Sequence, residues 1–377
     1  MNEKGMTAIS LKKINKNKVY QLIYREKITS KQQIVQKLQM GLSTVSQNLK
    51  LLEEEGLIER NGCFDSTGGR RAQAIQIASK ARVSIGVGIL KNMVFFTAVD
   101  LYGELICSSS SSLSYHPDEE YYQMLTSLIL QFTKTNHIPS SSVLGVSIAT
   151  QGIISPDGKT VNYGVIMDNF QMNVDDFASR IPYPCRLVHD SKAAADLELW
   201  NHPELDSAVV FLLNKNLGGA VITNHSVHQG LKMHSGTIEH LCIDPNGPLC
   251  YCKSRGCLET YCSANALETA ANVSAASFFE SLRMGNHAQF QMLWNDYLDH
   301  LAFAMRNLSM VIDSPVIISG YLAPYFIEED IDCLIQKVNT NSPFPFPRER
   351  IIVGTHGQYT PAIGASLYYI EQFLLSV

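Results

Sequence analysis

The sequence contains no apolar run of the roughly 18–20 residues that a membrane-spanning helix needs. Residues 1–13 also lack the apolar core of a signal peptide, so we expect a cytoplasmic protein. Charged residues make up only 17% of the chain, but 45% of its residues are hydrophobic, which excludes an intrinsically disordered protein. A length of 377 residues instead predicts two or three globular domains, each with its own core.

The charge of the chain is distributed unevenly. Residues 1–80 carry 14 basic and 7 acidic residues, a net charge of +7, whereas the remainder carries 16 and 28, a net charge of −12. A basic segment on an acidic body is typical of a nucleic-acid-binding module attached to a body that must not bind DNA itself. A basic tail without a partner is the alternative that charge alone leaves open.

The basic segment 1–80 has the pattern of a winged helix-turn-helix. Residues 17–24 place apolar side chains on one helical face, and Ser30 with Gln33 forms a capping box that opens a second helix. A third helix begins at Leu42 and ends before Gly56. Residues 57–60 and 72–77 then predict a two-stranded hairpin around a glycine-rich turn.

Polar side chains mark the surface of this module that would meet DNA. Short hydrogen-bonding groups and one cation lie on the outward face of the third helix, where a major-groove helix presents its side chains to base edges and phosphates. The turn of the hairpin adds two guanidinium groups for the DNA backbone or the minor groove. The predicted DNA contacts are Ser43, Thr44, Ser46, Gln47, Lys50, Arg70 and Arg71. A protein-interaction module is the alternative reading of the same pattern.

From residue 84 onward, strands and helices alternate. Three apolar runs follow one another between residues 84 and 113, then a helix over 118–135 and a strand over 143–149. Such alternation predicts α/β lobes in which helices cover a sheet. We expect a first lobe over 81–190, completed by the last helix within 361–377, and a second lobe over 191–360.

Four of the nine cysteines lie within 13 residues, which in a reducing compartment indicates a metal site rather than disulfides. Cys250, Cys252 and Cys257, with His240 ten residues before the first of them, supply four ligands for a closed tetrahedral zinc shell. The predicted zinc would be structural and would fix the 241–249 loop. Free cysteines that happen to cluster are the alternative, and Cys262 is expected to be a buried small hydrophobe.

Several segments together resemble the ROK family of repressors and sugar kinases. They are DLYGE at 100–104, HDSKAAA at 189–195, and Glu239-His240 followed by CYCKSRGCLE at 250–259. Within 1–80, Thr44-Val45-Ser46, Gly56-Leu57-Ile58 and Gly68-Gly69-Arg70 are similar to the winged helix of the repressor branch. The resemblance covers essentially the whole chain and implies a two-lobed, actin-like ATPase fold behind the DNA-binding module.

The phosphate-binding loops of the family's kinases are degraded in this sequence. Where those kinases read Asp-x-Gly-Gly-Thr-Lys, residues 88–93 read GILKNM, without the acid that helps to hold Mg²⁺ and without the glycine pair. Glycines are needed where backbone N–H groups approach a phosphate, because a Cβ would block the approach. The Gly-Thr-Gly loop aligns with Asn214-Lys215-Asn216, and Ser319-Gly320 remains of the third loop. We therefore expect no ATP turnover and no enzyme.

The family's sugar-binding residues match this sequence more closely than its phosphate-binding loops do. Asp190 matches the catalytic base, which without a phosphoryl donor can still accept a hydrogen bond from a sugar hydroxyl. The resemblance also implies effector contacts for His240 and Glu259, while His189 and Thr237 replace an Asn and a sugar-binding Glu. We include His189 among the effector contacts. The expected ligand is a carbohydrate or, because of His189 and Lys215, a sugar phosphate.

These features predict a sugar-responsive transcriptional repressor. The expected partners are operator DNA and a small effector, and two-fold symmetry of a homodimer or tetramer would match a pseudo-palindromic operator. Effector binding would favour one closure of the two lobes and so change the distance between the DNA-binding modules. The alternatives are a sugar kinase with a fused DNA-binding module and a regulator controlled by a protein partner.

Overall fold

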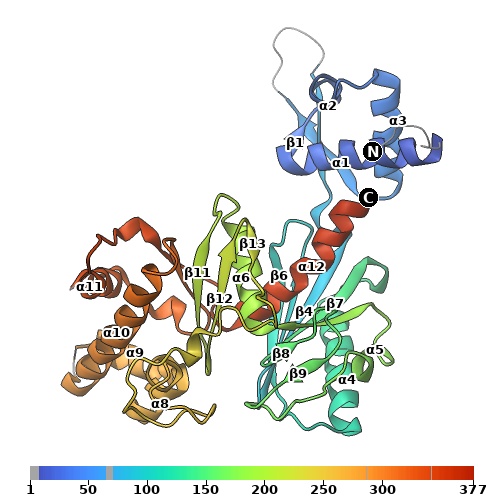
Figure 1. The fold of residues 1–377 in the computed structure, drawn as a ribbon. Coiled ribbons are helices and arrows are strands. Elements are labelled where there is room, and N and C mark those ends of the chain that lie inside the picture. The colour runs from blue at the N-terminus through green and yellow to red at the C-terminus, as the bar shows by residue number, and fades with distance from the viewer. Residues whose placement is uncertain (1–7, 65–70, 286, 341) are drawn as a thin grey trace.

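The computed structural model describes residues 8–64, 71–285, 287–340 and 342–377. Figure 1 shows three parts: a small N-terminal head and two larger α/β lobes that lie side by side below it. Within the described residues, no helix has both the length and the hydropathy needed to cross a bilayer.

The head is a winged helix-turn-helix. Helices α1 (Ala8–Glu26), α2 (Lys31–Leu38) and α3 (Leu42–Glu54) precede the wing strands β2 (Ile58–Cys63) and β3 (Gln73–Ile77). The capping box is present, since Ser30 Oγ accepts from Gln33 N–H and the Gln33 side chain accepts from Ser30 N–H. Gly56 has a φ of +67°, which suits a residue just after a helix end.

The head differs from the sequence-based expectation in two places. Helix α1 begins at Ala8, nine residues before the predicted start. The sheet has three strands rather than two, because β1 (Ile28–Thr29) pairs antiparallel with β3 and gives the order β1-β3-β2. A strand of two residues is too short to show an alternating pattern, so no sequence signal marked it.

Lobe one is built on a five-stranded sheet of order β10-β7-β4-β5-β6. Its strands β4 (Val83–Ile89), β5 (Met93–Val99) and β6 (Leu105–Ser112) form an antiparallel meander, and β7 (Val143–Thr150) and β10 (Cys185–His189) extend it in parallel to β4. Helix α4 (Glu119–Thr135) packs its apolar side against the sheet, with Leu125, Ile129 and Phe132 in one core with Val87.

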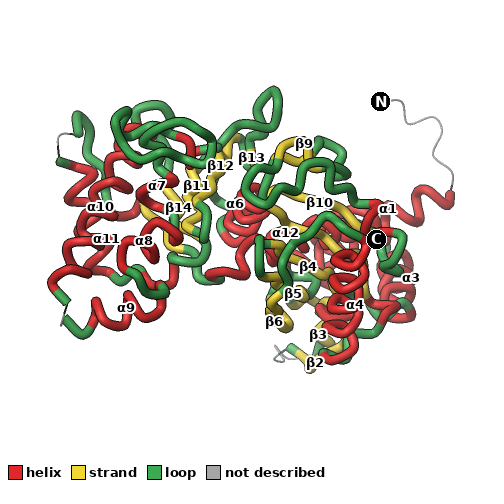
Figure 2. Tube along the Cα trace, turned by 90° about the horizontal axis from the view of Figure 1, so that it is seen from below, coloured by secondary structure: helices red, strands yellow, loops and turns green. Residues whose placement is uncertain are grey.

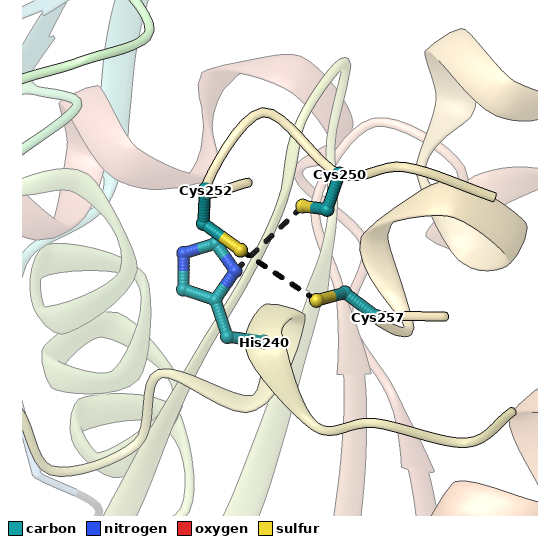
Figure 3. A group of neighbouring side chains, drawn as sticks. All are labelled: His240, Cys250, Cys252 and Cys257. Carbon is teal, nitrogen blue, oxygen red and sulfur yellow. Dashed lines mark hydrogen bonds between the residues drawn. The ribbon is translucent and has the colours of Figure 1, made fainter. Parts of the chain in front are cut away.

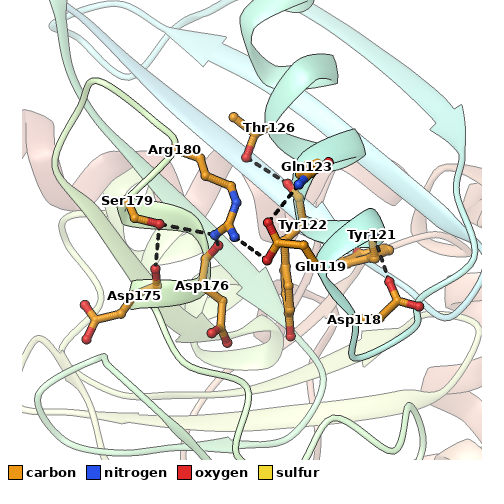
Figure 4. Close-up of polar contacts among 10 residues, drawn as sticks. All are labelled: Asp118, Glu119, Tyr121, Tyr122, Gln123, Thr126, Asp175, Asp176, Ser179 and Arg180. Atoms are coloured by element: carbon orange, nitrogen blue, oxygen red, sulfur yellow. Dashed lines mark hydrogen bonds and ion pairs between the residues drawn. The ribbon is translucent and has the colours of Figure 1, made fainter.

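A polar network fixes the excursion between β7 and β10 to α4 (Figure 4). This excursion contains β8 (Ile153–Ile154), β9 (Val161–Tyr163) and α5 (Asp175–Ala178). Arg180 forms an ion pair with Glu119 and donates to Ser179 Oγ at 3.1 Å and to the Asp176 carbonyl. Asp118 caps the same end of α4 by accepting from Tyr121 N–H at 2.8 Å. The excursion is thereby fixed to the N-terminal end of α4.

Lobe two contains a second five-stranded sheet, of order β13-β12-β11-β14-β15. Its strands are β11 (Ala208–Leu213), β12 (Leu217–Thr223), β13 (Ser226–Val227), β14 (Val316–Ser319) and β15 (Ile351–Val353). The helices are α7 (Glu259–Cys262), α8 (Ala264–Ala271), α9 (Ala275–Arg283), α10 (Ala288–Ser309) and α11 (Glu328–Asn339). Phe211 of the sheet shares a buried core with Phe278 and Trp294 of these helices, and Cys262 is buried there as expected.

Two helices lie between the lobes, α6 (Asp190–Asn201) and α12 (Thr360–Ser376), as Figures 1 and 2 both show. Their backbones approach closely, because a Cβ on Gly364 of α12 would lie 1.7 Å from the carbonyl oxygen of Ala193. Helix α12 also covers β4, where a Cβ on Gly86 would lie 1.8 Å from the carbonyl oxygen of Ala362. Glycine is therefore required at both positions.

The C-terminal end of α12 reaches the head (Figure 1). The side-chain amides of Asn17 and Gln21 donate to the carbonyl oxygen of Leu374, and the rings of Tyr20 and Phe373 meet edge to face with centroids 6.3 Å apart. Leu374 belongs to one apolar cluster with residues of α1, α3 and the wing. The head and lobe one thus share a continuous hydrophobic core.

Candidate functional site

Four potential metal ligands converge beside the cleft, on the lobe-two side (Figure 3). His240 ends the 3₁₀ turn Ile238–His240, and Cys250, Cys252 and Cys257 lie on the following loop. The Cys252 and Cys257 sulfurs are 3.7 Å apart, Cys250 Sγ is 3.9 Å from His240 Nδ1, and all four ligand atoms lie within 4.8 Å of one another. A tetrahedral ion that binds thiolates at about 2.3 Å separates its sulfurs by about 3.8 Å. The group fits one metal ion.

Backbone contacts hold this loop in shape. Gly256 has a φ of +64°, and a Cβ there would lie 1.5 Å from the carbonyl oxygen of Asp244, so no other residue fits. Leu258 N–H donates to the Leu241 carbonyl at 2.8 Å, which ties the two ends of the loop together. Burial lowers the pKa of His240, which favours the neutral imidazole that a metal ion requires.

Two adjoining cavities lie between the lobes. The outer cavity, of about 390 Å³, is lined by residues 88–93 at the β4–β5 turn, by residues 214–216 and by the start of α12. The inner cavity, of about 80 Å³, lies beside the metal-ligand cluster. Asp190, Gln151 and Ile166 line both cavities.

The outer cavity is lined by residues 88–93 and 214–216, the segments that the sequence analysis aligned with the phosphate loops of the family's kinases. Leu90 N–H donates to the Met93 carbonyl at 2.9 Å, and both side chains are part of the lining. Lys215 is ion-paired with Glu268, and its ammonium lies 4.9 Å from the centre of the Tyr321 ring. Lys215 thus has an acidic partner already, and it does not line the inner cavity.

Asp190 lines both cavities and His189 lines the inner one, at the point where β10 ends and α6 begins. Asp190 Oδ1 accepts from the N–H of Ser191 at 2.7 Å and lies 3.5 Å from His189 Nε2. Burial raises the pKa of Asp190 and lowers that of His189, and the charge of each partner opposes these shifts. With His240, these two residues bring three of the four predicted effector contacts to the inner cavity.

Glu259, the fourth predicted effector contact, is engaged with the protein itself. Its Oε1 accepts from Asn216 Nδ2 at 2.9 Å and its Oε2 from Leu217 N–H at 2.6 Å. Burial raises the pKa of Glu259 to about 7. Its hydrogen bonds connect α7 to the turn between β11 and β12, and Glu259 is not part of the lining of either cavity.

Glu239 is a residue of the inner cavity that the sequence analysis did not single out as a contact. It lies on the 3₁₀ turn with His240, and its side chain is buried, with only 8% of the residue exposed. Its Oε2 is buried and has no hydrogen-bond partner among the described residues. Burial, with smaller contributions from Asp190 and Glu259, raises the pKa of Glu239 to about 8. The sequence offered one signal for Glu239: it is an acidic residue two positions after Thr237, which stands where the family has a sugar-binding Glu.

The predicted DNA contacts lie on the head. Ser43, Gln47 and Lys50 are exposed on α3, whereas Thr44 and Ser46 are half-buried. Ser46 Oγ donates to the Leu42 carbonyl at 2.7 Å, and Lys50 lies 3.7 Å from the Glu54 carboxylate on the same helix. Arg71 is exposed two residues before the second wing strand, β3. Arg70 lies outside the described residues.

Known proteins resemble the chain over most of its length. It is 26% identical over 262 residues to the transcriptional dual regulator NagC of Escherichia coli, covering 68% of this chain and 64% of NagC. The chain thus spans less than two thirds of NagC. It is 23% identical to the xylose repressor of Bacillus subtilis, with 97% of each protein covered.

Structural similarity extends to the head. A crystal structure of a ROK family transcriptional regulator, described as a homologue of the E. coli MLC protein, superposes with a TM-score of 0.73 at 16% identity. That match covers 97% of this chain and 98% of the other, so it includes the winged helix as well as the two lobes. The sequence profile of the ROK family matches residues 84–372, both lobes and most of α12. The chain belongs to the ROK family.

Proposed function

We propose that this protein is a sugar-responsive transcriptional repressor whose kinase-like lobes bind an effector without phosphorylating it. The observation that carries the proposal is a winged helix with an exposed polar α3 face, joined through one continuous core to the helix that borders the cleft. The similarity of the chain to an N-acetylglucosamine repressor of Escherichia coli and to the xylose repressor of Bacillus subtilis supports it. Such a protein would act in the cytoplasm, where operator DNA is found.

In this proposal, α3 enters the major groove of the operator. Ser43 and Gln47 are exposed and placed for base edges, with Thr44 and Ser46 beside them, and Lys50 is placed for a phosphate. Arg70 and Arg71 would contact the DNA backbone or minor groove from the wing. A homodimer or tetramer would present two α3 helices to two half-sites.

We further propose that the Cys₃His group holds a structural zinc ion. Four protein ligands fill a tetrahedral shell and leave no open position for a substrate or water, which distinguishes structural from catalytic zinc. The ion would fix the 241–249 loop and, through His240, the turn that carries Glu239. Zinc would therefore shape the inner cavity without taking part in chemistry.

We infer that the cleft does not transfer phosphate from ATP. The 88–93 segment offers no carboxylate for Mg²⁺, and the side chains of Leu90 and Met93 occupy the lining where backbone N–H groups would have to approach phosphates. Asp190 then acts as a hydrogen-bond acceptor rather than as a base. The lobes divide at 81–190 with 361–377 and at 191–360, and effector binding would bias their closure.

The test uses the full-length, zinc-loaded protein and DNA recovered by selection from a random-sequence library. Fluorescence anisotropy with the recovered duplex is expected to show specific binding that at least one sugar changes. Lack of any sequence-selective DNA binding would overturn the proposal.

Two further readouts address the alternatives. ATP-dependent phosphorylation of a sugar by the pure protein would establish a kinase. DNA release that responds to cell extract but to no sugar would indicate a protein partner.

A further inference from the structure

A third cavity, of about 860 Å³, lies where the head, both lobes and α12 meet. Its volume is within the range of pockets that enclose small organic ligands. It is lined by Tyr24 and Lys27 of the head, by the end of β10, by α6, by residues from 225–233 and by one side of α12. It shares only Ile153 and His189 with the inner cavity and no described residue with the outer one, so it is a separate space.

Arg186, on β10, offers this cavity an unpaired guanidinium group. Its Cζ atom lies 3.8 Å from the centre of the Tyr368 ring on α12, so the ring covers one face of the group. No described residue accepts a hydrogen bond from it or forms an ion pair with it. Its nitrogens are not among the polar atoms that are sealed from solvent without a partner, so they are open to the cavity. A guanidinium held by stacking and free along its edges is preorganised to bind an oxyanion.

Lys192, on α6, brings a second cation to the same cavity. The residue is only 8% exposed, and the polar atom that its ammonium group contacts is the thioether sulfur of Met233, at 4.0 Å. A thioether is a weak acceptor without charge, so Lys192 has no counter-ion in contact among the described residues. Burying a charge without a partner is costly, and an anion in the cavity would remove that cost.

Asp196, one helical turn after Lys192, is the group that a second part of the ligand would meet. It lines the cavity and has no hydrogen-bond partner among the described residues. Desolvation by the surrounding protein, with a smaller contribution from Glu371, raises the pKa of Asp196 to about 7, and the charges of Arg186 and Lys192 oppose this shift. Near neutral pH this carboxyl group can either donate to a hydroxyl group or accept from one.

These groups together select the chemistry of the ligand. The two cations lie on different elements, β10 and α6, and a phosphate group has three terminal oxygens with which to contact both. A carboxylate has only two oxygens. Hydroxyl groups on the rest of the ligand would satisfy Asp196, and the rings of Tyr102 and Trp200 supply an apolar wall.

We propose that this third cavity is a second ligand site and that it binds a small, hydroxyl-bearing phosphate ester, with the phosphate at Arg186 and Lys192 and a hydroxyl group at Asp196. The site goes beyond the proposed function, which requires only the cleft that contains Asp190. Because Lys27 and Tyr368 line the same cavity, its ligand lies beside both the head and α12.

The test compares three variants in which Met replaces a cation, since Met is unbranched like Lys and Arg but uncharged. Arg186→Met and Lys192→Met each remove one of the two proposed phosphate contacts. Lys215→Met is the matched control, because it removes a cation of the outer cavity that is already paired with Glu268. Each zinc-loaded, full-length protein is titrated calorimetrically with glycerol 3-phosphate, ribose 5-phosphate and fructose 1,6-bisphosphate, with glycerol, ribose and fructose as uncharged counterparts, and with citrate.

We expect at least one phosphate ester to bind the wild type and to lose roughly tenfold or more in affinity in both Arg186→Met and Lys192→Met. The same ester should bind Lys215→Met within about twofold of the wild type. Any uncharged counterpart that binds should do so equally well in all three variants. Arg186→Met and Lys192→Met should melt within about 2 °C of the wild type, because neither side chain has a counter-ion to lose.

Phosphate esters that bind Arg186→Met and Lys192→Met as they bind the wild type, or that lose affinity only in Lys215→Met, would overturn the proposal. Tighter binding of citrate than of every phosphate ester would overturn it as well. A wild-type protein that binds DNA and an uncharged sugar but none of these anions would refute this site and leave the proposed function standing. Anion binding that depends on Arg186 and Lys192, in a protein without sequence-selective DNA binding, would instead refute the proposed function and retain the site.

Discussion

Gly86 and Gly88 offer a sharp test of how α12 is packed on lobe one. Both residues lie on β4 and face Ala362 of α12. A Cβ on Gly86 would lie 1.8 Å from the carbonyl oxygen of Ala362 and 2.7 Å from Thr97 Oγ1, whereas a Cβ on Gly88 would have no neighbour closer than 3.6 Å. Gly86→Ala therefore creates a backbone clash, and Gly88→Ala, two residues away, creates an ordinary contact.

The clash sets the expected magnitude. To restore a distance of at least 3.0 Å, α12 or β4 must shift by 1.2 Å or more, and the obstacle is backbone rather than a flexible side chain. Overpacking of this kind costs about 3 kcal/mol, the upper part of the usual range. The unfolding entropy of a 377-residue protein is roughly 0.8 kcal/mol/K, at about 2.1 cal/mol/K per residue, so such a loss lowers the melting temperature by about 4 °C.

Differential scanning calorimetry of the wild type and both variants measures this effect, with urea unfolding as a second readout. Gly88→Ala is expected to melt within about 2 °C of the wild type. If Gly86→Ala also melts within that interval, α12 does not pack on β4 as described. The proposal that α12 couples the cleft to the head would then be refuted.

Three further predictions follow from other parts of the molecule. Lys50→Ala and Arg71→Ala should each weaken DNA binding and reduce the slope of log K against log salt concentration by about one, whereas Lys31→Ala on α2 should leave both unchanged. Slopes equal to that of the wild type would exclude phosphate contacts for Lys50 and Arg71. Cys252→Ser should lose the bound metal and lower the melting temperature, whereas Cys242→Ser, which changes an exposed cysteine of the same loop, should retain the metal. Elemental analysis that finds no zinc in the native protein would contradict this prediction. Burial raises the pKa of Glu198 in the folded protein, so the folded state binds more protons than the unfolded state, and stability falls as the pH rises above about 4.5 toward that raised pKa. Glu198→Gln should make this decline shallower when the free energy of unfolding is measured by urea titration at several pH values. An unchanged decline would assign it to other groups.

Local sequence signals predicted the parts of the fold that depend on neighbouring residues. Ser30 and Gln33 are three residues apart and satisfy each other's backbone, so the start of α2 was readable from sequence alone. The spacing of Cys250, Cys252 and Cys257 predicted a group whose atoms do converge, because a short loop with a glycine at 256 brings them together.

Features that depend on distant contacts were not readable. The two-residue strand β1 exists only because β3, more than 40 residues later, pairs with it. The Oε2 of Glu239, which has no partner among the described residues, and the two paired oxygens of Glu259 differ in their tertiary contacts, and the sequence analysis predicted only Glu259 as an effector contact. No pattern of residue types distinguishes a satisfied buried carboxylate from an orphaned one.

Helix α12 contacts the cleft at its first turn and the head at its last turn, so a tilt that begins at the cleft would move the head. Ala362 and Leu374 are 12 residues apart on it, about 18 Å along the axis, so pivoting the helix by about 5° at Ala362 would displace Leu374 by about 1.6 Å. Because the Leu374 carbonyl accepts a hydrogen bond from α1 and its side chain lies in the apolar cluster of the head, this displacement would move the whole head as a rigid body. In a two-fold assembly, opposite swings of two such modules would add, and a mismatch of a few ångströms would suffice to take one α3 out of register with its half-site.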